Sequence, residues 1–344
     1  QNTRRCIVVT TINRPYGLLR AGFPYLTSLG MRRMTTNCAD IAIGQEGRLY
    51  SLNHLPMQIL RFNWDDVDLG GWSGTGENTL GSGVQVLADK NEDLWISDEG
   101  KHCVFVYTRD GEFIRKIGEY GDGDGQRNRP SGIVFDSEET LYVVDTTNHR
   151  IQKFANDGKF LSSFGSYGSK EGELNLPWGI EIDEVGDIYV ADWRNDRIQK
   201  FTNDGKFIMS FGTSGDDDGQ FNRPTGLALD PHGDIYVADW GNNRIQQFDQ
   251  TGRFVDKFIG DATMGKAART YMMSNAVPLR LREMRSLEES KRFRAPMSVR
   301  MGEDFKLYVP DYAAHRIQIY QKEAYPLKEG EIAEPLRNPT LTVT

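Results

Sequence analysis

The chain lacks several features that would assign it to a familiar functional class. No apolar run approaches the roughly 20 residues that a membrane-spanning helix needs. No Gly-x-Ser-x-Gly nucleophile motif occurs, and no pair of carboxylates stands out as a general acid and base. The three cysteines, Cys6, Cys38 and Cys103, are widely spaced and form no Cys-x-x-Cys pair. The sequence therefore predicts neither a disulfide framework nor a zinc knuckle, and we expect ordinary buried or strand cysteines.

Positive charge is scarce over most of the chain, whose net charge is −8. Residues 1–36 carry six arginines and no acidic residue, and residues 261–294 carry eight basic and four acidic residues, so the remainder is strongly acidic. An acidic body argues against nucleic-acid binding across it. The basic segments are candidates for contacts with that body, an anionic partner, a second copy or a larger complex. Because the chain starts at Gln1 rather than Met, a leader removed on export is one expectation, and the compartment stays open.

A repeated strand pattern organises the chain. The stretch Asn222–Phe254 holds three strand signals, Gly226–Asp230, Ile235–Asp239 and Arg244–Phe248, separated by turn-forming residues. Its central pattern, hydrophobic-Tyr/Trp-x-x-Asp, recurs at intervals of 45, 47, 47, 47 and 72 residues, with copies that end at Asn53, Asp98, Asp145, Asp192, Asp239 and Asp311. Five residues after each copy come Gln58, Cys103, Arg150, Arg197, Arg244 and Arg316. This period, with about four short strands per copy, predicts an all-β fold, a six-bladed β-propeller.

The repeats set the expected domain organisation. Residues 36–321 form the propeller, preceded by an N-terminal arm at 1–35 and followed by an extended tail at 322–344. An insertion at about 260–292, with short helices expected at Thr263–Ser274 and Pro278–Lys291, lengthens the connection to the last blade. That blade lacks an evident fourth strand. We expect Arg5–Thr10 in the N-terminal arm to supply it, because its pattern matches fourth-strand copies such as Lys159–Phe164 and a closed ring leaves no free sheet edge.

The repeats resemble NHL repeats. The resemblance is carried by RPSGIVFD…LYVVDTTNHRIQKF at 129–154, LPWGIEID…IYVADWRNDRIQKF at 176–201 and the stretch at 222–254. It extends over residues 36–321 and implies a six-bladed propeller, as in TRIM-NHL proteins and peptidyl-hydroxyglycine amidating lyases. In those lyases, zinc-binding histidines directly follow the Pro that opens a repeat. The matching residues here are not zinc ligands; they are Ser131, Trp178, Thr225 and Met297, with Ala39 and Val84 in the degenerate repeats.

Most repeated polar residues are expected to be architectural. The repeat Asp can accept backbone N–H groups of a tight turn, and the Arg five residues later can bind a carboxylate. His102, His149 and His315 occupy one repeat position, so we expect them to support the fold rather than a metal. The acidic loops at 121–125 (GDGDG) and 215–219 (GDDDG) lack EF-hand spacing. We expect solvated loops there, with calcium as the alternative, and otherwise no cofactor and no metal.

One aromatic set is less easily explained by the repeat. The residue after the repeat Asp is aromatic in three successive blades, at Trp193, Trp240 and Tyr312, and Trp178 opens the inner strand of blade four. These four residues are the candidate binding site, because exposed Trp and Tyr are enriched at binding surfaces. The favoured function is a non-catalytic interaction scaffold that binds a protein or peptide through this propeller face. The alternative is a hydrolase or lyase of the lactonase or amidating-lyase type with a divalent cation at the central channel.

Overall fold

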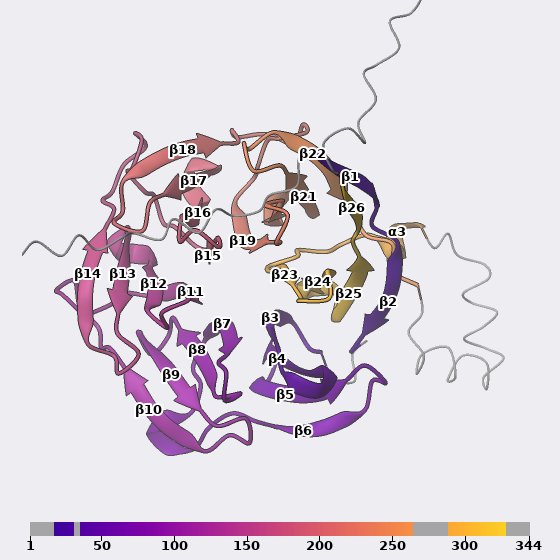
Figure 1. The fold of residues 1–344 in the computed structure, drawn as a ribbon. Coiled ribbons are helices and arrows are strands. Elements are labelled where there is room, and N and C mark those ends of the chain that lie inside the picture. The colour runs from indigo at the N-terminus through magenta and orange to yellow at the C-terminus, as the bar shows by residue number, and fades with distance from the viewer. Residues whose placement is uncertain (1–16, 31–34, 264–287, 328–344) are drawn as a thin grey trace, which may run out of the picture.

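The computed structural model describes residues 17–30, 35–263 and 288–327 as a ring of six four-stranded antiparallel sheets, with a separate two-stranded sheet at its edge (Figure 1). The predicted six-bladed propeller is therefore confirmed. Blades one and two contain β3 (Cys38–Ile43), β4 (Arg48–His54), β5 (Met57–Asn63) and β6 (Asp68–Trp72), then β7 (Gly83–Ala88), β8 (Leu94–Asp98), β9 (Cys103–Tyr107) and β10 (Phe113–Ile117). Blade three contains β11 (Pro130–Phe135), β12 (Leu141–Asp145), β13 (Arg150–Phe154) and β14 (Phe160–Phe164).

The later blades follow the same order from the axis outward. Blade four contains β15 (Ile180–Ile182), β16 (Ile188–Asp192), β17 (Arg197–Phe201) and β18 (Phe207–Phe211), and blade five contains β19 (Pro224–Leu229), β20 (Ile235–Asp239), β21 (Arg244–Phe248) and β22 (Phe254–Phe258). Blade six contains β23 (Arg300–Met301), β24 (Lys306–Asp311) and β25 (Arg316–Gln321). Short 3-10 helices occur at η1 (Gln45–Gly47), η2 (Gly76–Asn78), η3 (Thr146–Asn148), η4 (Trp193–Asn195), η5 (Trp240–Asn242) and η6 (Tyr312–Ala314).

The hydrophobic core lies between neighbouring blades rather than inside any one of them. Each of six buried clusters combines side chains of two adjacent blades, and together they follow the whole ring. The second strand of a blade is therefore covered on both faces. All five residues of β12, β16 and β20 are buried, which explains why these strands are almost continuously apolar instead of alternating. Cys38 and Cys103, in β3 and β9, are free and fully buried, as expected of strand cysteines.

The N-terminal arm supplies the fourth strand of blade six, but not at the position that we predicted. The outer strand is β2 (Tyr25–Leu29), which pairs with β25, while Arg5–Thr10 lies outside the described residues. The sequence YLTSL of β2 matches FLSSF of β14, and each is followed by a glycine with positive φ, 87° at Gly30 and 94° at Gly165. The ring is thus closed by a strand from the opposite end of the repeat region.

A second pairing of the chain's two ends lies beside blade five. Strands β1 (Gly17–Gly22) and β26 (Glu323–Leu327) form an antiparallel two-stranded sheet next to β22 (Figure 1). From this ribbon, Lys322 donates to Asp230 and to Oδ2 of Asp234 (2.8 Å), and Nε of Arg20 donates to Asp234 (2.9 Å). The side chains of Lys322, Asp230 and Asp234 are at most 1% exposed. We call this group the clasp.

The clasp supplies blade five with the positive charge that blade four obtains from a lysine of its own. On β17 of blade four, Lys200 binds Asp183 and Asp187 at 3.1 and 2.8 Å. The corresponding residue of blade five is Gln247, which donates to Asp234 (2.9 Å) but brings no charge. Burial alone raises the pKa of the Asp234 carboxyl, but the hydrogen bond from Arg20 and the charge of Lys322 outweigh it, and the pKa is lowered. The ribbon therefore supplies positive charge to two buried carboxylates.

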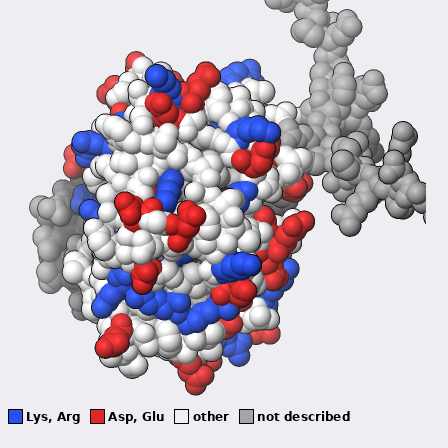
Figure 2. Space-filling model, turned by 90° about the vertical axis from the view of Figure 1, so that its left-hand side faces the viewer, with Lys and Arg blue, Asp and Glu red and all other residues white. Residues whose placement is uncertain are grey.

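The insertion before the last blade is described only at its ends. Helix α3 (Glu288–Lys291) is the described part of the expected helix Pro278–Lys291, and the expected helix from Thr263 onward falls almost wholly in residues 264–287, outside the described chain. No helix of the described residues is long and apolar enough to cross a membrane. On the side of the ring that includes β14 and β18, acidic and basic side chains are interspersed rather than gathered into one basic surface (Figure 2).

Candidate binding face and central channel

The repeat Asp anchors the loops of one face of the ring. In blade three, Oδ1 of Asp145 accepts the backbone N–H of Asn128 (2.7 Å), and Oδ2 accepts from Asn148 (2.9 Å) and from Nε of Arg150 (2.8 Å). The same bond between the Asp and the Arg five residues later occurs in blades four, five and six, at 2.7–2.8 Å. Each Asp thereby joins the turn that follows its strand to the segment that leads into the first strand of the same blade. These contacts are architectural, as the repetition predicted.

The repeated histidines join one blade to the next. Nδ1 of His149 accepts the backbone N–H of Leu176 at 3.0 Å, and His102 and His315 make the same bond to Arg129 and Asn37. At this repeat position in blades four and five, the acceptors are the side-chain oxygens of Asp196 and Asn243. A histidine that accepts at Nδ1 must be neutral there. Accordingly, burial lowers the pKa of His149.

Two tryptophans and two arginines form a cluster on this face, which we call the Trp193 cluster. The rings of Trp178 and Trp193 lie 6.2 Å apart between centroids, at 34°. The guanidinium carbons of Arg194 and Arg223 lie 5.4 and 5.2 Å from the Trp193 centroid. Trp178, Trp193 and Arg223 are half-buried and Arg194 is exposed. Within the described residues neither guanidinium pairs with a carboxylate. The sequence pointed to both tryptophans but not to the arginines.

The other two predicted aromatics occupy equivalent loops but do not join that cluster. Trp193, Trp240 and Tyr312 begin η4, η5 and η6 in three successive blades, and each is half-buried. Tyr312 contacts His54 of blade one instead, with ring centroids 5.5 Å apart and its hydroxyl 3.2 Å from Nδ1 of His54. Trp240 makes no ring contact with another described residue. The four predicted residues therefore share a face, and only Trp178 and Trp193 form a pair.

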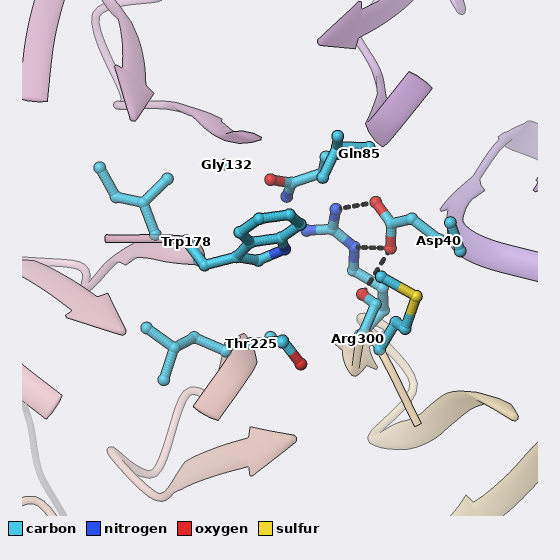
Figure 3. A pocket seen from close by; sticks show the side chains of 14 residues that line it. Asp40, Gln85, Gly132, Trp178, Thr225 and Arg300 are labelled. Atoms are coloured by element: carbon cyan, nitrogen blue, oxygen red, sulfur yellow. Dashed lines mark hydrogen bonds and ion pairs between the residues drawn. The ribbon is translucent and has the colours of Figure 1, made fainter. Parts of the chain in front are cut away.

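The inner strands of all six blades meet at a narrow central channel. The Trp178 side chain projects toward its centre, and Arg300 reaches across to Asp40 (Figure 3). Asp40 accepts from Nε of Arg300 at 3.0 Å, from the Ser298 hydroxyl at 2.5 Å and from a backbone N–H at 3.0 Å. The cavity volume is only about 20 Å³, about the space that one water molecule needs. The channel is therefore nearly filled by its own side chains.

A second carboxylate lies beside the same arginine. Oε2 of Glu181, on β15, is 4.0 Å from Nη1 of Arg300, and Asp40 already occupies the rest of that guanidinium. Burial raises the pKa of Glu181 to about 7, with Arg300 opposing the shift. Glu181 is the titrating group of the channel near neutral pH.

Sequence comparison agrees with this architecture. The model of the NHL repeat matches residues 221–248, that of a six-bladed β-propeller family matches residues 74–165, and that of the SMP-30/gluconolactonase/LRE-like region matches residues 125–215. The chain is a six-bladed propeller that contains NHL repeats. No curated protein matches this NHL propeller in sequence.

Solved structures share the fold of the NHL propeller at low sequence identity. A catalytically inactive virginiamycin B lyase from Staphylococcus aureus with quinupristin is 15% identical, with a TM-score of 0.56 and coverage of 90% of each chain. A structure of unknown function from Bacteroides thetaiotaomicron is 19% identical, with a TM-score of 0.60, covering 88% of this chain and 73% of the other. A chain of a nidogen/laminin complex is 18% identical at a TM-score of 0.51, covering 64% and 79%. At these identities the likeness shows the fold alone.

The positions that would carry zinc in the amidating lyases can now be located. Five of the six line the channel, namely Ala39, Val84, Trp178, Thr225 and Met297. In blade three the lining residue is Gly132 instead of Ser131. None has a side chain that binds zinc. Within residues 17–30, 35–263 and 288–327, no three His, Cys, Asp or Glu side chains gather as a metal site would require. The loops at 121–125 and 215–219, proposed as the calcium alternative, belong to that part of the chain.

Sequence reasoning also missed two exposed tyrosines next to the repeated histidines. Tyr120 and Tyr167 are 65% and 69% exposed, and their rings lie 4.8 Å from those of His102 and His149. The shared motif Tyr-Gly in the two loops was the available signal. They extend the aromatic character of the NHL propeller to blades two and three.

Proposed function

We propose that this NHL propeller binds a protein segment through the face that carries the Trp193 cluster. One observation supports this most directly: two guanidinium groups without a described carboxylate partner lie against a half-exposed tryptophan. Trp, Tyr and Arg dominate the binding energy of protein interfaces. An arginine held against an aromatic ring loses little conformational freedom when it binds a carboxylate. The expected partner therefore presents an acidic residue beside an apolar one.

The match to the SMP-30/gluconolactonase/LRE-like region favours the hydrolase or lyase alternative, but the geometry of the channel gives it no comparable support. The channel cavity of about 20 Å³ is far below the several hundred Å³ of a typical small-molecule site. Of its two carboxylates, Asp40 is almost wholly buried and is bound by Arg300 and Ser298, and Glu181 lies 4.0 Å from the same guanidinium. A scaffold role requires neither an open channel nor a free carboxylate.

The test is a native pull-down with mass spectrometry on the wild type and on Trp193→Ala, with Arg194→Glu/Arg223→Glu as a second variant. Leu161→Ala is the matched control, because Leu161 is 50% exposed on the outer strand β14, away from this face. We expect a protein that is retained by the wild type and by the control, and lost by both cluster variants at unchanged circular dichroism. If a folded Trp193→Ala/Trp240→Ala double variant keeps every partner, this face is not the binding site.

A further inference from the structure

The opposite face of the ring contains a cleft that the repeat pattern does not predict. Its volume is about 570 Å³, within the usual range of small-molecule sites. It lies where blades six, one and two meet, and it is independent of the Trp193 cluster and of the function proposed for it. The lining includes apolar residues, one tryptophan, one tyrosine and several carboxylates, among them Ile43, Trp64, Asp89, Met301, Asp304 and Tyr308.

The cleft lies where two adjacent blades depart from the repeat. In blades three, four and five, the turn between the first two strands starts with an Asp that accepts the hydroxyl of the Tyr six residues later, at 3.2, 3.4 and 2.7 Å. In blade two, Asp89 accepts the indole N–H of Trp95 in the same way (3.0 Å). Blades one and six have Gly44 and Gly302 at this position, although Tyr50 and Tyr308 are retained. The missing side chains add to the space.

Tyr50 and Tyr308 have no aspartate at this repeat position, and their hydroxyl groups lie in different surroundings. In blade one, Glu92 of the neighbouring blade accepts the Tyr50 hydroxyl at 3.2 Å. In blade six, the Tyr308 side chain is almost wholly buried, with the residue 2% exposed, but its hydroxyl has no hydrogen-bond partner among the described residues. Burial first, and then the charge of Asp304, raises the pKa of Tyr308, so the group is a neutral donor. This hydroxyl is not one of the wholly buried polar atoms, so it opens into the cleft, where it can donate to water or to a ligand.

The remaining lining restricts the chemistry of that ligand. Trp64 is half-buried beside Tyr308, with ring centroids 5.8 Å apart. Nζ of Lys306 lies over the Trp64 ring, 4.8 Å from its centroid, so the opposite face of the indole is the one that a ligand could contact. The charged residues of the lining are Asp89, Glu92, Glu303 and Asp304 against Lys90. Glu92 is paired with Arg48 and Arg109, and Asp304 with Lys306, so Asp89 and Glu303 are the two carboxylates of the lining without a described ion pair. Carboxylates only accept hydrogen bonds, whereas Tyr308 has one to donate. A ligand hydroxyl meets both demands, because it accepts from Tyr308 and donates to a carboxylate.

We propose that this cleft binds a polyhydroxylated ring compound that is neutral or carries an amino group. The ring packs against Trp64 and accepts a hydrogen bond from the Tyr308 hydroxyl. A sugar ring has the required combination of hydroxyls and an apolar face, and an amino group on it adds attraction to the carboxylates. A uronic acid has the same ring with the wrong charge. The expected order of affinity is glucosamine, then glucose, then glucuronate.

Gly302→Asp is the decisive variant, because it restores the residue that four other blades have. Gly302 does not occupy the positive-φ region, and a Cβ there would lie 3.2 Å from Tyr308 and 2.8 Å from the exposed carboxylate of Asp304, which can move. The new Asp would accept a hydrogen bond from the Tyr308 hydroxyl and occupy the part of the cleft next to it. We therefore expect Gly302→Asp to melt no lower than the wild type while losing binding. Tyr308→Phe keeps the ring and should weaken binding at least fivefold.

The measurement is isothermal titration, with saturation-transfer NMR for weak binding, using glucosamine, glucose and glucuronate on the full chain. Glucosamine binding to the wild type that is weakened in Tyr308→Phe and abolished in a folded Gly302→Asp supports the proposal. Glucuronate binding as tight as glucosamine binding, no detectable binding of any of the three sugars, or binding that survives Gly302→Asp would each overturn it.

Discussion

The ammonium of Lys322 lies 2.8 Å from Oδ2 of Asp234, although 88 residues separate them in the chain. This contact replaces within blade five the contact that blade four makes internally through Lys200. It also joins the ribbon of β1 and β26 to the ring. Blade five therefore has an uncharged residue, Gln247, where blade four has a lysine, and Lys322 from outside the repeats supplies the missing charge.

Replacing Lys322 by Met should lower the free energy of unfolding by about 2–4 kcal/mol, because it leaves two buried carboxylates with only Arg20 as a cation. Adding Gln247→Lys should recover a large part of that loss, since it restores the lysine of blade four. The control is Lys90→Met, whose exposed pair with Glu139 should be worth less than about 1 kcal/mol. Urea unfolding measures the free energy of unfolding of each variant. If the double variant is no more stable than Lys322→Met, Lys322 does not take the place of the lysine that blade four has at this position.

The histidine links between blades predict a pH dependence. The pKa of His149 is lowered in the folded protein, so the unfolded state binds more protons just below the ordinary value of about 6.5. The contribution of His149 to stability is therefore complete above about pH 6.5 and is lost as the pH falls below that value. His149→Asn, which puts the residue of blade five at this position, should keep the bond to Leu176 and remove this loss. Thermal melts between pH 5 and 8 test it, and His149→Ala should cost about 1 kcal/mol throughout.

Glu181 should act in the opposite direction. Its pKa is raised to about 7 in the folded protein, so between about pH 4.5 and 7 the folded state binds more protons than the unfolded state. Stability from this group is present at low pH and is lost as the pH rises through 7. Relative to Glu181→Gln, the wild type should lose about 1–3 kcal/mol between pH 5 and 8. Denaturation curves of the two proteins that stay parallel over this range would show that Arg300 already compensates the charge of Glu181.

Closure of the ring by β2 can be tested with two leucines of the same strand. Leu29 is 3% exposed and belongs to the cluster between blades six and one, whereas Leu26 is 44% exposed. Leu29→Ala should cost about 2–4 kcal/mol, and Leu26→Ala less than about 1 kcal/mol. Differential scanning calorimetry gives both values. Equal effects of the two substitutions would mean that β2 does not seal the ring.

The regular part of the fold could be predicted from the sequence because identical residues make identical contacts. The steps of 47 residues place Asp145, Asp192 and Asp239 at equivalent turns, and their shared bonds explain why the spacing is constant. The position of the Trp178 and Trp193 side chains on one face followed from the same alignment. The alignment of the repeats was enough to predict the number of blades and the architectural role of the Asp and Arg pair.

What escaped prediction depends on contacts that the repeat does not contain. The strand Tyr25–Leu29 is too short to stand out beside Arg5–Thr10, and only its pairing with β25 identifies it. Tyr312 was expected near Trp240, but ring closure brings His54 of blade one against it. Gly302 is visible in the sequence as a departure from Asp, yet its consequence, an unpaired Tyr308 beside a cleft, requires the packing of three blades. Differences between repeats are thus more informative about sites than the repeats themselves.

The ribbon of β1 and β26 has a consequence for the order of blades along the chain. Gly17 and Leu327 face each other directly across that ribbon. A short linker between these two positions would therefore span almost no distance, and new ends opened in an exposed connecting loop would leave every sheet intact. Because each blade contacts mainly its two neighbours, such a circularly permuted chain would retain the same clusters between blades. The ring has no structurally obligatory first blade.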